Sequence, residues 1–93
     1  MTWRVRVRPR AELNLLAAAQ WYESQRQGLG AEFADELVLL LESLAENALL
    51  YPEVIHGVRR VFARRFPYIA YFRIAGGDVI VLRILHMRRD RSL

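Results

Sequence analysis

The chain has 93 residues, a length that allows one domain with a moderate hydrophobic core. It contains no Cys, which excludes disulfides and thiolate chemistry, and no apolar run of the roughly 18–20 residues needed to span a bilayer. The net charge of +4 is unevenly distributed, since residues 1–10 carry +4, residues 11–56 carry −7 and residues 57–93 carry +7. The two basic ends favour acidic partners, either phosphates or carboxylates.

The first predicted element is a strand over residues 3–8, where apolar side chains alternate strictly with arginines. Trp3, Val5 and Val7 share one side, which we expect to be buried. Pro9 then ends the strand and suits the first turn of a helix.

A helical hairpin follows, with helices predicted over residues 11–26 and 31–47 and a turn at Gly28-Leu29-Gly30 between them. The apolar stripe predicted for the first helix consists of Leu13, Leu16, Ala17, Ala18 and Trp21. The stripe predicted for the second consists of Phe33, Leu37, Leu40, Leu41, Leu44 and Ala48. Acidic residues cover the rest of the second helix, so the hairpin is expected to be acidic outside and apolar inside.

From Gly57 onwards the period returns to two, which predicts strands over residues 58–63, 68–74 and 79–86. In the last strand, one face is predicted to hold Ile80, Leu82 and Ile84, and the other to hold Val79, Val81, Arg83 and Leu85. The predicted fold class is α+β with the order β-α-α-β-β-β. We expect a small, mostly antiparallel sheet with the helical hairpin packed on one face.

Candidate chemistry lies in the basic and aromatic second half of the chain. Guanidinium groups stay charged and bind phosphates or carboxylates in a planar fork. His86 is the titrating acid–base candidate near them, although a structural histidine fits the pattern equally well. The sequence shows no Gly-rich phosphate loop, no Ser nucleophile elbow and no metal-ligand spacing. The residues alone therefore indicate a basic domain that binds an acidic partner.

Three stretches of the sequence resemble a known family. They are Ala31–Pro52, the run Arg64-Arg65-Phe66-Pro67-Tyr68 leading into a strand, and a strand that ends His86-Met87-Arg88-Arg89-Asp90. Together with the order of elements, they resemble the RelE/ParE superfamily of bacterial toxins from type II toxin–antitoxin systems. The Arg-Phe-Pro-Tyr and His-x-Arg-Arg-Asp motifs are similar to the plasmid-stabilisation branch, nearer ParE than RelE.

The resemblance implies that residues 1–93 form a single toxin domain that acts in the cytoplasm, without a cofactor, a metal or a membrane anchor. It also implies a hetero-oligomer with a cognate antitoxin. The antitoxin's C-terminal segment would cross the hairpin and bind the apolar outer face of the last strand. The antitoxin-binding residues expected there are Val79, Val81 and Leu85.

The superfamily divides by mechanism. ParE-like members inhibit DNA gyrase by binding, whereas RelE-like members cleave mRNA on the ribosome. The chain departs from the nuclease pattern at Tyr68, where those members carry an Arg, and in lacking their C-terminal Tyr. We therefore expect a gyrase inhibitor rather than an enzyme. Its expected target-binding residues are Arg60, Arg64, Arg65, Tyr68, Arg83, Arg88 and Arg89.

Two alternatives remain open at this point. A ribosome-dependent mRNA endoribonuclease would use His86 as the acid–base group together with Arg89. A basic module that binds RNA or protein without toxicity would use the arginines alone.

Overall fold

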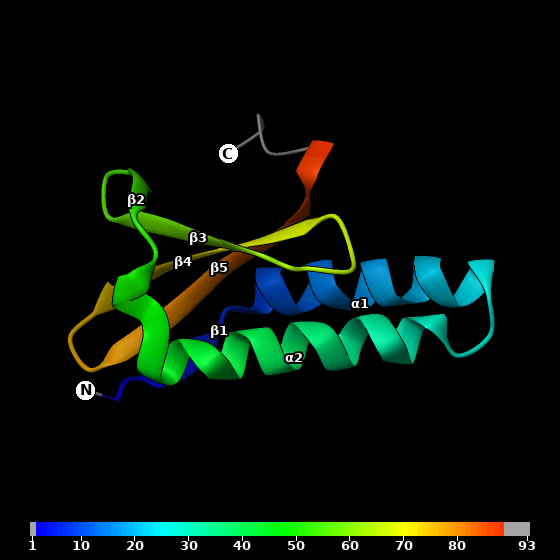
Figure 1. Cartoon of the computed structure of the whole chain (residues 1–93), viewed down its shortest axis with the longest axis horizontal. Helices are drawn as coiled ribbons and strands as arrows, with labels where there is room; N and C mark the ends of the chain where they lie inside the picture. The colour runs from blue at the N-terminus through cyan, green and yellow to red at the C-terminus, as the bar shows by residue number, and fades with distance from the viewer. Residues whose placement is uncertain (1, 89–93) are drawn as a thin grey trace.

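The computed structural model describes residues 2–88 and folds them into two layers, a five-stranded sheet and a pair of helices packed on one face of it (Figure 1). The helical elements are α1 (Pro9–Gln25), α2 (Leu29–Asn47) and the short 3₁₀ helix η1 (Ala48–Leu50). The strands are β1 (Arg4–Val7), β2 (Glu53–Ile55), β3 (Val58–Phe62), β4 (Tyr68–Ala75) and β5 (Asp78–His86).

The sheet order is β1-β5-β4-β3-β2, with β1 parallel to β5 and the other neighbours antiparallel. The α+β fold predicted from the sequence is confirmed, including the hairpin on one face of the sheet. The sequence pattern does not predict β2, because its residues are all exposed and show no alternation. No helix within residues 2–88 is long and apolar enough to cross a membrane.

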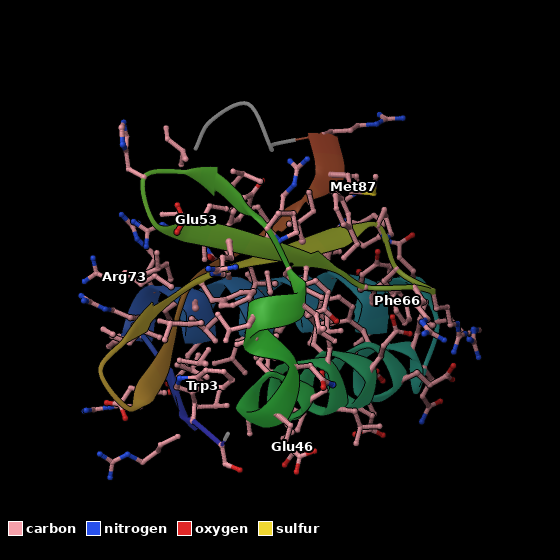
Figure 2. The ribbon with its side chains drawn as sticks, turned by 60° about the vertical axis from the view of Figure 1, so that its left-hand side comes forward. Trp3, Glu46, Glu53, Phe66, Arg73 and Met87 are labelled. Atoms are coloured by element: carbon pink, nitrogen blue, oxygen red, sulfur yellow. The ribbon has the colours of Figure 1, made fainter. Side chains whose placement is uncertain are left out.

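The first strand confirms its predicted buried side. Trp3 is only 6% exposed and lies between β1 and α2 (Figure 2), where its backbone N–H donates to the carbonyl oxygen of Ala45 over 2.7 Å. On the opposite face of β1, the guanidinium groups of Arg4 and Arg6 each lie 3.3 Å from the Asp78 carboxylate of β5. These ion pairs fasten the parallel edge of the sheet.

The turn of the helical hairpin is held by one carboxylate. Gly28 has a φ of 89°, in the left-handed region that favours glycine. The Glu23 carboxylate accepts hydrogen bonds from the backbone N–H groups of Gly28 (2.9 Å) and Gly30 (3.0 Å). Because the first N–H groups of a helix have no partner within it, Glu23 satisfies donors that would otherwise depend on water.

Helix α2 supplies the centre of the core, as the sequence predicts. Its buried residues are Gly30, Phe33, Leu37, Leu41 and Leu44, and Ala48 follows them in η1. At one end of the core, aromatic rings from α1, α2, β4 and the β3–β4 loop pack together, with ring centroids of contacting pairs 4.8 to 6.1 Å apart. These rings belong to Tyr22, Phe33, Phe66 and Tyr68.

Of the apolar stripe predicted for helix α1, only Ala18 is buried. The buried residues of the helix are Ala11, Ala18 and Tyr22. The prediction that Leu13, Leu16 and Trp21 face the core is wrong, since these side chains are 63%, 56% and 57% exposed. Apolar residues surround most of this helix, so their spacing does not select one side. The small alanine side chains allow α1 to approach its neighbours closely, and the large side chains are left at the surface.

Strand β5 contains a β-bulge at Leu82. Tyr71 of β4 is paired with Arg83, whereas the next residue, Phe72, is paired with Val81. Leu82 is therefore an extra residue on the β5 side of the ladder, and it shifts the alternation of side chains along the strand.

The bulge explains why the predicted faces of β5 are partly wrong. Val79 and Val81 are 0% exposed and belong to the core beneath the helices, so they do not lie on an outer surface. Ile84, beyond the bulge, also belongs to the core, although the alternation places it opposite the two valines. Of the three residues expected to bind the antitoxin, only Leu85 is partly exposed.

Candidate functional site

The sheet has one face that the helices leave uncovered, and we call it the outer face. Ala70 and Phe72 of β4 point into the core, so Ile69, Tyr71 and Arg73 must point the other way. Their cross-strand partners on the same face are Arg60 and Phe62 from β3 and Ile80, Arg83 and Leu85 from β5. Arg73 projects outward from the sheet in Figure 2. The outer face is therefore built from arginines and apolar side chains together.

A row of three residues crosses the middle of the outer face. Tyr71 is directly paired with Arg60 on one side and with Arg83 on the other. The Arg60 guanidinium carbon lies 5.2 Å from the centre of the Phe62 ring, a cation–π contact. Arg83 donates a hydrogen bond from Nη1 to the carbonyl oxygen of Leu82 over 2.8 Å. Arg60 and Arg83, two of the predicted target-binding residues, are thus brought together by the ladder.

A groove of about 700 Å³ lies on the helix side of the sheet, between α1 and the end of β5. Apolar and aromatic side chains make up most of its wall, with polar groups at few positions. It is lined by Asn14, Ala17, Ala18, Trp21, Tyr22, Pro67, Tyr68, Ile84, Leu85, His86 and Arg88.

The edge of β5 along this groove has no neighbouring strand in the part of the chain that the structure describes. Strand β1 pairs with β5 only as far as Val81, where the Arg8 N–H donates to the Val81 carbonyl oxygen over 3.0 Å. Farther along, the Asn14 side-chain oxygen accepts a hydrogen bond from the Ile84 N–H over 3.1 Å. An exposed strand edge beside an apolar groove can receive an added peptide segment.

His86 lies in this groove and not on the outer face. It is directly paired with Tyr68, and the two rings pack edge to face with centroids 5.2 Å apart. Because the Tyr68 ring contacts Phe33 of α2, this pair is on the helix side of the sheet. The His86 Nδ1 accepts a hydrogen bond from the Arg88 N–H over 3.1 Å, so in the neutral ring the proton is on Nε2.

The sheet therefore separates His86 from the arginines of the outer face, Arg60 and Arg83. A general acid–base group must reach the reacting atoms directly or through one water. The described residues do not place His86 and these arginines around a common substrate position. Arg89, the other predicted catalytic residue, lies outside the described residues.

The predicted arginines of the β3–β4 loop have structural contacts. The Glu36 carboxylate accepts hydrogen bonds from the backbone N–H groups of Arg64 (2.8 Å) and Arg65 (3.0 Å). The Arg65 guanidinium pairs with Glu32 of α2 and lies 5.1 Å from the centre of the Phe66 ring. The hydrogen bond from Arg65 holds the pKa of the Glu32 carboxyl below its ordinary value, against the opposing effect of desolvation. Arg65 thus fastens the loop to α2.

The predicted site residues consequently fall into three places. Arg60 and Arg83 are on the outer face, Arg64 and Arg65 are in the loop beside α2, and Tyr68, His86 and Arg88 line the groove. Sequence reasoning missed the groove wall that α1 provides. One available signal was Asn14, a single amide in the otherwise apolar run from Leu13 to Ala19.

Comparisons with known proteins identify a matching family and similar folds. A family model described as the ParE toxin of the type II toxin–antitoxin system parDE matches residues 5–91. A chain from the structure of the chromosomal ParDE system of P. aeruginosa is similar, with 22% identity, a TM-score of 0.83, and coverage of 91% of this chain and 96% of that one.

A chain from the RelBE2 toxin–antitoxin complex of Mycobacterium tuberculosis is also similar, with 20% identity and a TM-score of 0.61. That alignment covers 92% of this chain and 99% of the other. At these identities the two structures support the fold. No curated protein matches the sequence.

Proposed function

Because the family model spans residues 5–91, the chain belongs to the ParE toxin family of type II toxin–antitoxin systems, and we propose that it inhibits DNA gyrase by binding to it. On this proposal the protein acts in the cytoplasm and catalyses no reaction of its own. A cognate antitoxin neutralises it by occupying part of its surface. Gyrase is the target that membership of the ParE branch implies.

The observation that carries a binding function is the composition of the outer face. Arg60 and Arg83 flank Tyr71 there, and the exposed ring of Phe62 lies beside Arg60. Arginine and aromatic residues set among apolar neighbours are enriched in the energetically important parts of protein interfaces. We assign this face to the target.

The separation of His86 from the outer arginines supports binding over mRNA cleavage. A nuclease needs the acid–base group and the phosphate-binding cations on one side of the substrate. His86 is instead on the helix side, with its ring against Tyr68.

We assign the groove between α1 and β5 to the antitoxin. Trp21 on its wall is 57% exposed, and Leu13 and Leu16 extend the exposed apolar surface of α1. An apolar antitoxin segment would cover this surface, and an acidic side chain on it would meet Arg88 at the rim. Leu85, expected from the sequence to contact the antitoxin, is at the boundary of the two surfaces, since it lines this groove while its pairing with Ile69 places its side chain on the outer face.

Calorimetric titration of purified toxin into purified gyrase tests this proposal, with the same toxin added to a purified translation reaction as the second arm. We expect saturable binding to gyrase and intact mRNA in the translation reaction. Ribosome-dependent mRNA cleavage, together with no binding to gyrase, would contradict the proposal and favour the endoribonuclease alternative.

A further inference from the structure

The Tyr71 hydroxyl is an unusual group in this fold. Among the buried side-chain nitrogen and oxygen atoms of residues 2–88, it alone has no hydrogen-bond partner. The Tyr71 side chain is 0% exposed, although it is directed away from the helical layer. A buried hydroxyl that has lost water without gaining a partner lowers stability, so a structural role would be served better by phenylalanine.

The surroundings of Tyr71 are cationic. Its direct cross-strand partners are Arg60 and Arg83, and Arg73 is two residues farther along β4. None of the ion pairs formed within residues 2–88 involves Arg83, which donates a hydrogen bond to the carbonyl oxygen of its neighbour Leu82. A hydroxyl donor beside guanidinium groups is an arrangement suited to an oxyanion.

We propose that the Tyr71 hydroxyl and the Arg83 guanidinium, flanked by Arg60, form a binding site for a carboxylate of a protein partner. The hydroxyl donates one hydrogen bond to the carboxylate and Arg83 donates a second, charge-assisted one. Rotation of the flexible Arg83 stem admits the carboxylate, as side-chain changes commonly do on binding. This inference rests on the proposed function, which identifies the protein partner as gyrase.

The structure favours a carboxylate over a nucleic-acid phosphate. Proteins that bind single strands stack bases on exposed aromatic faces, whereas the Tyr71 ring is fully buried and the exposed Phe62 ring is already in contact with the Arg60 guanidinium. The exposed Phe62 and the partly exposed Ile80 share the outer face with the arginines. A protein surface with an acidic residue among apolar ones complements this face, whereas a phosphate backbone would leave its apolar part without a partner.

Tyr71→Phe removes only the hydroxyl and tests the site. Tyr51→Phe is the matched control, because the Tyr51 ring packs against Phe72 on the helix side. Each variant and the wild type are titrated against gyrase, a short polyglutamate peptide and a short single-stranded DNA, and each is unfolded thermally. We expect Tyr71→Phe to bind both gyrase and polyglutamate roughly 10- to 100-fold more weakly, as for a lost hydrogen bond to a charged group. Its melting temperature should equal or exceed that of the wild type.

Each outcome is decisive. Equal affinity of Tyr71→Phe and wild type for polyglutamate and gyrase would overturn the site. A lower melting temperature of Tyr71→Phe with a matching loss of affinity would make the hydroxyl structural and also overturn it. A loss confined to the single-stranded DNA would show a phosphate site and overturn the carboxylate assignment. If the wild type does not bind gyrase but binds polyglutamate more tightly than Tyr71→Phe does, the proposed function is wrong and the carboxylate site is supported.

Discussion

Gly30 is placed where α2 starts to pack against α1, and it has no room for a side chain. A Cβ atom at this position would lie 2.5 Å from the Ala19 carbonyl oxygen and 3.0 Å from the Glu23 side chain. Because the obstacle is helix backbone, we expect Gly30→Ala to destabilise the protein by about 1–3 kcal/mol in urea unfolding. Gly77→Ala is the control, since nothing lies within 4 Å of its Cβ position. Equal stability of the two variants would contradict the close approach.

At the level of single residues, the sequence indicates the chemistry but not the direction of a side chain. The clustering of arginines marks Arg60 and Arg83 as candidates, and the ladder confirms that they lie on one face. The sequence does not show that Tyr71 lies between these two arginines, because the register of β3 against β4 depends on the intervening loop. The sequence also does not show that His86 lies on the helix side of the sheet, opposite these arginines, because this placement follows from the bulge at Leu82.

The backbone of the β3–β4 loop is bound by one carboxylate of α2, in addition to the side-chain ion pair between Arg65 and Glu32. Glu36 accepts the backbone hydrogen bonds of Arg64 and Arg65, so Glu36→Ala should release the loop and lower stability by about 1–3 kcal/mol. Glu42→Ala on the exposed side of the same helix serves as the control. Hydrogen exchange of the two amides reports the contact directly. Unchanged exchange rates in Glu36→Ala would show that the loop does not depend on this carboxylate.

The exposed side of α1 should matter for the antitoxin and not for folding or the target. Trp21→Ala removes a large apolar side chain that is 57% exposed and lines the groove. Loss of an aromatic anchor of an interface costs about 2 kcal/mol or more, so we expect antitoxin affinity to fall by roughly 30-fold or more. Gyrase inhibition should stay unchanged. Loss of gyrase inhibition with retained antitoxin binding would reverse our assignment of the two surfaces.

Elements differ in how much of them the sequence predicts. Helix α2 is predicted well because large side chains such as Phe33 and Leu37 recur on one side only. In α1, by contrast, Leu13 and Ala18 are equally apolar in the pattern, and only tertiary packing shows that the alanine is buried. A bulge such as the one at Leu82 adds a residue to the strand without a sequence signal. The faces predicted from strict alternation are therefore wrong beyond the bulge.

Across the molecule, carboxylates paired with arginines should make stability depend on acid pH. The pKa of the Glu32 carboxyl is lowered from 4.5, chiefly by the hydrogen bond from Arg65. Burial raises the pKa of Asp78, but hydrogen bonds from Arg6 and Arg4 outweigh it and lower the pKa from 3.8. Because the folded-state pKa values are lower, the unfolded state binds protons first. The stability that these groups contribute is present above their ordinary pKa values and is lost as the pH falls through the lowered ones.

We therefore expect the melting temperatures of Glu32→Gln and Asp78→Asn to be lower than that of the wild type at neutral pH and to converge with it in acid. Thermal unfolding from neutral pH to about pH 2 measures the convergence. A difference that stays constant over this range would mean that the two carboxyl groups contribute through packing and not through their charge.

The fold places the acidic and basic segments of the chain in different layers. The acidic segment, residues 11–56, forms the helical layer, and the basic segments form most of the sheet. The molecule is thus two-sided, with a cationic outer face and an apolar groove on the helix side. Because the two surfaces are separate, an antitoxin confined to the groove would leave the outer face accessible, so neutralisation requires the antitoxin to extend over that face as well.

Inhibition of gyrase is measured most directly as the loss of supercoiling of relaxed plasmid by purified gyrase. The folded toxin is titrated into the reaction, and the cognate antitoxin is added back as the control. We expect supercoiling to be lost as toxin is added and to be restored by the antitoxin. Full supercoiling in the presence of a folded toxin that still inhibits growth when induced would contradict the proposed inhibition of gyrase.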